Sequence, residues 1–302
     1  MMLFKKSKKE KEENVFNQDL SQKENPGYVF VMVLFMKEKC PMPDREKMTT
    51  IMQKHLGKVE CFTHSDNAAG FAANNYRVEF EQGAIPPQLM ITGCTKRPKE
   101  PLDELTVSQM WDCQEDRERI LSECKYQVLA TDMMAAVMDY RERADMLMDY
   151  MEALVELYPT CEAVYFMTSG KMFTVERIRN HNIPRDKRFL YFAVNVRFFN
   201  IQGTDDMLVD TLGMTTLFLP DLQYHFHGMN PDWVVNHAYN MLSYIYDNEN
   251  PIKDNDSIDG IKDGNMSRDV MWICHYEDSL IQPARGILDI YMNEYAAGGR
   301  AY

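Results

Sequence analysis

An uninterrupted apolar run near the N-terminus constrains the fold most strongly. Residues 28–36 read YVFVMVLFM, which is of strand length and rich in β-branched and aromatic side chains. A strand that is apolar at every position offers no face to water, so this run predicts a strand covered on both sides. The sequence therefore favours a sheet with further layers packed against both of its faces.

Helical signals alternate with strand signals along the rest of the chain. The clearest helix is predicted over residues 141–158, where an apolar stripe precedes Pro159. Another begins with Asn230 at the N-cap and Pro231 in the first turn, and it runs to Tyr246. Further helices are predicted over residues 44–56, 106–121 (with Thr106 as the N-cap) and 175–180.

Strands are predicted in the intervening segments, over residues 58–63, 76–80, 89–92, 126–134, 163–167, 189–200, 211–219 and 272–276. Two of these strands, 189–200 and 211–219, are expected to pair with each other across a polar loop at 203–206. The mixed order predicts an α+β fold with largely antiparallel sheets and packed helices. Two similar β-α-β-β halves, meeting near residues 97–106, are also consistent with it.

The domain organisation follows from composition. Residues 1–26 are charged and poor in aromatic side chains, which predicts a disordered tail. Residues 27–290 form a single α+β domain in this interpretation, with 97–106 as a candidate internal boundary. Residues 291–302 are expected to fray.

Bulk charge and cysteine usage restrict the class of protein. A formal net charge of −13 repels nucleic-acid phosphates, so no nucleic-acid partner is expected. No apolar segment reaches the roughly 18 residues needed for a membrane span. The seven cysteines are scattered without a CxxC pair, which indicates reduced thiols and a cytoplasmic protein.

The densest group of chemically active side chains lies in the last third of the chain. It comprises Asp210, Asp221, His225, His227 and His237. A His-x-His pair on a strand and a third histidine on the next helix would supply three metal ligands. The spacing matches no established metal motif, so the preferred interpretation is turn, cap and surface chemistry, with no metal and no cofactor.

One face of the predicted 230–246 helix carries the second candidate site. That face presents Asn236, Tyr239, Asn240 and Tyr246. Tyrosine and amide side chains suit protein recognition. The same residues are equally compatible with a half-buried position at a sheet edge.

Several short motifs of this region occur together in a fixed order. They are residues 210–214 (DTLGM), 219–223 (LPDLQ), Asn230-Pro231 and 246–248 (YDN), preceded by a helix and residues 162–166 (EAVYF). In this order and spacing the chain resembles the bacterial domain-of-unknown-function family 4261. The resemblance covers about residues 28–280 and is most specific over 204–260. It implies no established activity and no catalytic residues.

Three functions remain open from the sequence. The preferred one is a non-enzymatic, protein-binding or regulatory domain of the immunity type, because no catalytic constellation is evident and the acidic chain suits a basic protein partner. The second is a metal-assisted hydrolase that uses His225, His227 and His237. The third is a small-molecule sensor with a pocket between two similar halves.

Overall fold

The first of two large sheets occupies the N-terminal half of the chain. The computed structural model describes residues 15–23, 27, 29–81 and 83–299. The strand order is β10-β9-β1-β8-β6-β3-β2, with β7 beside β8, and all these pairs are antiparallel. The strands are β1 (Val31–Met36), β2 (Val59–His64), β3 (Ala68–Ala73), β6 (Gln88–Thr92), β7 (Thr95–Lys96), β8 (Tyr126–Met133), β9 (Cys161–Phe166) and β10 (Lys171–Thr174).

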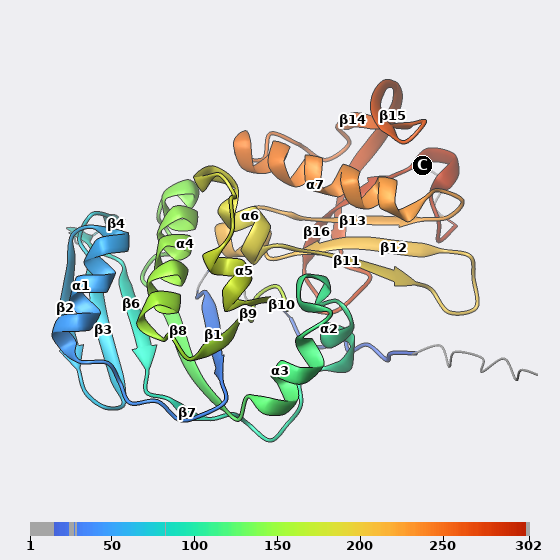
Figure 1. Ribbon diagram of the computed structural model, residues 1–302. Helices are drawn as coiled ribbons and strands as arrows, with labels where there is room; N and C mark the ends of the chain where they lie inside the picture. The colour runs from blue at the N-terminus through green and yellow to red at the C-terminus, as the bar shows by residue number, and fades with distance from the viewer. Residues whose placement is uncertain (1–14, 24–26, 28, 82, 300–302) are drawn as a thin grey trace, which may run out of the picture.

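Strand β1 lies inside this sheet and is covered on both faces, as its sequence predicts. Met32 and Leu34 belong to the main core, which includes side chains of α1 (Arg45–Leu56) and α4 (Tyr140–Leu157). Val33 and Phe35 point the other way into a second cluster with Ile120 of α3 (Arg117–Glu123). Figure 1 shows α1 and α4 on one side of the sheet. The predicted pair of covering layers is therefore confirmed.

The second large sheet follows in the C-terminal half, with the order β11-β12-β13-β16-β15-β14. Its neighbours are antiparallel except for the parallel pair β13 and β16. Helix α7 (Pro231–Asp247) lies along one face of it (Figure 1). The strands are β11 (Asn195–Asn200), β12 (Met207–Leu212), β13 (Asp221–Phe226), β14 (Ser257–Lys262), β15 (Asn265–Asp278) and β16 (Gly286–Tyr291). A two-stranded sheet pairs β4 (Val78–Phe80) with β5 (Gly83–Ile85).

The chain is thus an α+β protein with largely antiparallel sheets, as predicted, but residues 97–106 do not separate its halves. The strands on both sides of that segment, β7 and β8, belong to the first sheet. The change of sheet occurs between β10 and β11. It is made by α5 (Val175–Arg179), η2 (Arg185–Lys187) and α6 (Arg188–Ala193).

The helix predicted over residues 106–121 is broken. It forms α2 (Glu104–Ser108), the 3-10 helix η1 (Trp111–Cys113) and α3, and its N-cap is Asp103, whose carboxylate accepts from the Thr106 amide at 2.9 Å. The break follows from Gln109, whose groups are used elsewhere. Its side chain accepts from the amide of Phe198, and its carbonyl accepts from the Asn195 side chain. These bonds to β11 replace the continuation of the helix.

Two predicted strands are only partly strands. Residues 189–193 belong to α6, because an apolar run of this length is compatible with either element and Phe189 and Phe192 are buried from a helix here. The strand predicted over 211–219 ends at Leu212, and η3 (Met214–Leu217) follows. The turn is held by Asp221, whose carboxylate accepts from the amides of Gly213 and Met214. The predicted antiparallel pairing of the two segments is confirmed as β11 with β12.

Both terminal segments touch the second half of the chain where they are described. Gln22 accepts from the Ala284 amide at 3.0 Å, so residues 15–23 lie beside the 280–284 loop. Ala297 donates to the His225 carbonyl at 2.9 Å, which attaches the segment after η4 (Asn293–Tyr295) to β13. The remainder of the predicted N-terminal tail, residues 1–14 and 24–26, and residues 300–302 lie outside the described residues. Throughout the described part, no helix combines the length and apolarity that bilayer crossing requires.

Candidate functional site

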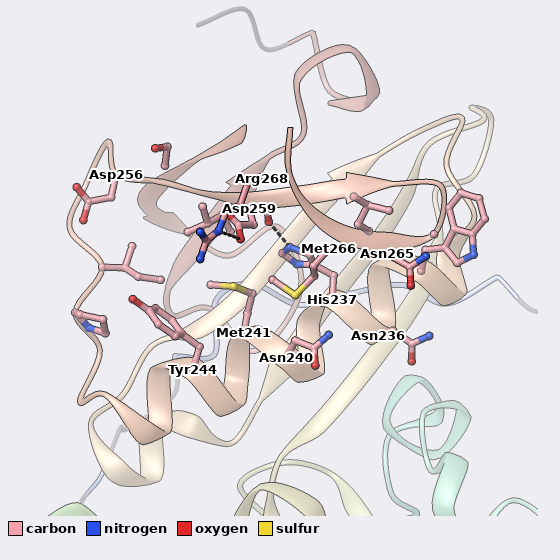
Figure 2. Close-up of a pocket in the computed structure, with 17 residues that line it drawn as sticks. Asn236, His237, Asn240, Met241, Tyr244, Asp256, Asp259, Asn265, Met266 and Arg268 are labelled. Carbon is pink, nitrogen blue, oxygen red and sulfur yellow. Dashed lines mark hydrogen bonds and ion pairs between the residues drawn. The ribbon is translucent and has the colours of Figure 1, made fainter. Parts of the chain in front are cut away.

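A groove lies between helix α7 and strand β14, and we call it the α7–β14 groove. Its volume is about 890 Å³. Helix α7 forms one wall, β14 forms the other, and the β14–β15 turn closes one end (Figure 2). The side chains that matter below come from three elements: Asn236, His237, Asn240 and Tyr244 from α7, Asp259 from β14, and Met266 from β15.

The sequence fixes the orientation of α7. Asn230 caps the helix by accepting from the Asp232 amide at 2.9 Å, and Pro231 occupies the first turn. The apolar stripe of this helix, Val234, Ala238, Met241, Leu242 and Ile245, is buried against the sheet. Exposed amide and aromatic groups are left on the flank toward β14.

Strand β14 is the outermost strand of its sheet, so one side of its backbone has no neighbouring strand among the described elements. The Asp259 carbonyl is turned to that side, because it accepts from His237 Nε2 at 2.8 Å across the groove. Backbone groups of an antiparallel strand point alternately toward and away from the partner strand. His237 occupies the Asp259 carbonyl, and the other outward-facing backbone groups of β14 are the strand-type donors and acceptors that face the groove.

His237 joins the two walls. Its Nδ1 lies 3.0 Å from the Tyr224 hydroxyl, and its Nε2 lies 2.8 Å from the Asp259 carbonyl. Since a carbonyl only accepts, Nε2 carries the proton and Nδ1 accepts from the tyrosine. Burial lowers the pKa of His237, and the Asp259 carbonyl only partly opposes this. The neutral imidazole therefore acts as a fixed spacer between helix and strand.

A pH-dependent stability is expected from His237. Its pKa is lower in the folded than in the unfolded protein, so between these values the unfolded state binds more protons. The free energy of unfolding should therefore fall as pH drops below about 6.5, by up to about 1.4 kcal/mol per unit. Urea titrations of wild type and His237→Gln between pH 7.5 and 5 test this. The difference between the two curves should change over that window, and a constant difference would contradict the assignment.

The far end of the groove is closed by a tight turn. Gly264, at φ 79°, sits between β14 and β15, and a Cβ at this position would lie 2.9 Å from the Trp233 ring. Only glycine combines this conformation with so close an approach. The turn therefore rests on the first turn of α7, and the Met266 side chain lies in the groove near His237 (Figure 2).

The groove lies in an acidic part of the chain. Residues 230–269 contain eight acidic side chains and three basic ones, a net charge of −5. Helix α7 itself has no lysine or arginine. Among the groove residues, Asp256 and Asp259 are opposed only by Arg268, whose side chain is 93% exposed and lies 3.9 Å from Asp259.

The structure separates the candidate polar cluster. Asp210, Asp221 and His225 lie on β12 and β13, whereas His237 projects from α7 onto the opposite face of the sheet, where Tyr224 points. His225 and His227 lie 3.7 and 3.9 Å from the Asp206 carboxylate. The three histidines therefore do not converge. In the described residues, no group of three or more His, Cys, Asp and Glu side chains is arranged to hold a metal ion.

Asp210 and Asp221 belong to a buried ionic network. Asp210 receives both Arg197, at 2.8 and 2.5 Å, and Arg285, at 2.6 Å. Asp221 lies 3.5 Å from Arg285 and accepts from the Thr211 hydroxyl at 3.0 Å. Burial raises the pKa of Asp221, and the Arg285 guanidinium opposes this. These carboxylates hold strands and the 279–285 loop together and are closed to solvent.

The candidate helix face needs one correction. Tyr246 is buried at 3% exposure, and its ring packs edge-on against Tyr140. Tyr239 is exposed but does not line the groove, and burial of its hydroxyl raises its pKa to about 12. Asn236 and Asn240 do line the groove. The face therefore divides, and two of its four residues meet β14.

The opposite wall of the groove was missed in the sequence. Residues 247–265 read as a polar, turn-rich segment, yet residues 257–262 form β14. Its burial alternates only weakly, because Asp259 and Gly260 interrupt the apolar positions Ile258 and Ile261. The sequence signal that could have identified this strand is the Asp-Gly turn at 263–264, which has short apolar segments on both sides.

Comparison with known families gives one result for this region. Residues 210–291 match the model of a family described as Domain of unknown function (DUF4261). The match spans β12 to β16 and includes both walls of the α7–β14 groove. Neither the curated proteins nor the solved structures contain a match to the chain.

Proposed function

We propose that this chain, which belongs to the DUF4261 family through residues 210–291, is a protein-binding domain. In this proposal, the α7–β14 groove takes up an extended, basic segment of a partner protein. The observation that carries the proposal is the free side of β14, turned into a groove that helix α7 lines with amide side chains.

Strand addition is the binding mode that this geometry supports. A peptide laid along an open sheet edge gains main-chain hydrogen bonds, and neighbouring pockets select alternate side chains. From Trp233 to Tyr244, α7 extends about 17 Å at 1.5 Å per residue. That length accommodates about five residues of extended chain at about 3.3 Å each.

The helical wall supplies a second set of partners. Asn236 and Asn240 are exposed, and within the described part of the chain neither side-chain amide has a hydrogen-bond partner. An amide offers both a donor and an acceptor, which matches a peptide backbone. A bound strand would thus be paired with β14 on one side and with these amides on the other.

The negative charge around the groove determines which kind of partner segment it attracts. The net charge of −5 over residues 230–269 attracts lysine and arginine side chains and repels acidic ones. The whole chain has the same sign, at −13. Electrostatic steering of this kind mainly raises the association rate, so binding should weaken as salt rises.

Selection from a displayed library of random ten-residue peptides tests the proposal. We expect enriched peptides to carry net positive charge and to bind more weakly at 500 mM than at 50 mM salt. N-methylation along a selected peptide should reduce binding about tenfold or more at alternate residues, because only alternate amides face β14. Fluorescence anisotropy measures both effects.

Matched variants assign the binding to the groove. The double variant Asn236→Ala/Asn240→Ala should weaken peptide binding about tenfold, since each lost hydrogen bond contributes about 1 kcal/mol. Tyr239→Ala, on the same helix but outside the groove, should leave it within about twofold. The proposal fails if no peptide is enriched, or if the double variant binds the selected peptides as tightly as wild type.

A further inference from the structure

A second cavity lies where the two sheets meet, and we call it the inter-sheet cavity. Its volume is about 650 Å³, and none of its lining residues lines the α7–β14 groove. Its inner wall is the β9–β10 turn at residues 168–170 together with the start of β11. Its outer wall is the loop at Gln282 and Pro283 together with four residues of the N-terminal segment, Asn17, Gln18, Asp19 and Gln22.

Four polar groups of this cavity have no hydrogen-bond partner in the described part of the chain. Thr168 Oγ1 and Ser169 Oγ are buried and unpartnered. The Tyr165 hydroxyl and Arg197 Nη1 likewise form no hydrogen bond there, although Arg197 uses its other nitrogens. Tyr165, Ser169 and Arg197 are 7%, 0% and 3% exposed. Buried polar groups are nearly always paired, so the two buried hydroxyls of Thr168 and Ser169, side by side in one cavity, indicate a missing partner.

The cavity also has a separation of charge. Arg197 donates through Nη2 to the Gln282 carbonyl at 3.0 Å. The Gln282 side chain donates in turn to the Asp103 carboxylate at 3.2 Å. Gln282 therefore connects the Arg197 guanidinium to the Asp103 carboxylate. Because Arg197 is already paired with Asp210, a simple anion would gain little net attraction and would also face Asp103.

We propose that the inter-sheet cavity binds a small zwitterion, a free amino acid or a dipeptide. The ligand carboxylate accepts from Arg197 Nη1 and from the Thr168 and Ser169 hydroxyls, and its ammonium group faces Asp103. Guanidinium and hydroxyl donors are the usual partners of carboxylates, and a carboxylate is the usual partner of an ammonium group. The volume lies within the range of small-molecule sites.

The N-terminal segment forms one side of this ligand site. Gln18 accepts from the Gln282 amide at 3.2 Å, and Gln22 accepts from Ala284 at 3.0 Å. Phe16 packs beside the cluster formed by Leu105 and Ile281. The Thr168 and Ser169 hydroxyls themselves are buried, which strengthens their polar contacts to the ligand.

Isothermal titration calorimetry of the full chain at pH 7 tests the proposal. The probes are the twenty amino acids, diglycine and dialanine, with acetate and methylammonium as single-charge controls. We expect at least one amino acid or dipeptide to bind, and acetate and methylammonium to bind at least about tenfold more weakly. The groove variant Asn240→Ala should bind the same ligand as wild type does, which separates this result from the peptide-binding proposal.

Two shape-conserving variants locate the ligand. Thr168→Val and Tyr165→Phe each remove one hydroxyl, and Thr168→Val should lower ligand affinity about tenfold. Tyr165→Phe should have a similar or smaller effect. Neither should lower the thermal midpoint without ligand, because neither hydroxyl has a protein partner in the described residues. The proposal is overturned if no probe binds, which leaves only water at these hydroxyls, if acetate binds as tightly as the amino acids, or if Thr168→Val binds like wild type.

Discussion

Replacing Arg285 with methionine is expected to lower the free energy of unfolding by about 3–5 kcal/mol. Arg285 is 7% exposed and donates to Asp210 at 2.6 Å and to the Thr211 carbonyl at 2.8 Å. Without it, Asp221 loses a cation at 3.5 Å and remains buried. Methionine fills similar space but restores neither charge nor donors, so the folded state contains an uncompensated carboxylate.

Urea unfolding followed by far-ultraviolet circular dichroism measures this loss. Arg268→Met is the matched control, because the Arg268 side chain is 93% exposed. It should change the free energy of unfolding by no more than about 0.5 kcal/mol. Equal midpoints for the two variants would show that the Arg285 network contributes no more than surface charge.

Replacing Arg143 with methionine is expected to have an effect of the same size, about 3–5 kcal/mol. Arg143 is 1% exposed and lies on α4, where its Nε donates to Asp132 at 2.9 Å. It also donates to the Gly27 carbonyl and, at 2.7 Å, to the Thr216 carbonyl of η3. One side chain thereby links the first sheet, the N-terminal segment and the second half of the chain.

A double-mutant cycle separates the charge from the packing. Asp132→Asn removes the negative charge and keeps an oxygen that accepts from the Phe30 amide. Because the carboxylate is then no longer unpaired, Arg143→Met/Asp132→Asn should be more stable than the sum of the two single changes predicts, by about 1–3 kcal/mol. Simple additivity would mean that the loss in Arg143→Met comes from the hydrogen bonds to Gly27 and Thr216.

Local signals predicted the elements that depend on a few neighbouring residues. The apolar run before Met36 requires a doubly covered strand, and Asn230-Pro231 requires a helix start, because burial and capping act over one turn or one strand. Predictions from local signals were wrong where a residue distant in the sequence forms hydrogen bonds with the segment. The helix predicted from Thr106 ends early because Gln109 bonds to β11, which no local pattern encodes.

The α7–β14 groove and the inter-sheet cavity likewise depend both on local signals and on contacts between distant segments. Asn236 and Asn240 were identified from helical spacing, yet their role depends on β14, an element of weak alternation that the sequence did not reveal. In the inter-sheet cavity, Thr168 and Ser169 come directly after the strand predicted over residues 163–167. Their isolation from hydrogen-bond partners depends on Arg197 and the N-terminal segment, which come from distant parts of the chain.

The sequence by itself determined the fold class, the covered strand, the orientation of α7 and the family signature, because these rest on periodicity, capping and short motifs. Only the tertiary structure decided what the polar residues do. Asp210 and Asp221 are in a charged network because Arg197 and Arg285 fold back onto them. His237 spaces the groove because Asp259 lies opposite it. Hydrogen bonds and ion pairs act over a few ångströms in space, so their partners are set by how distant segments meet.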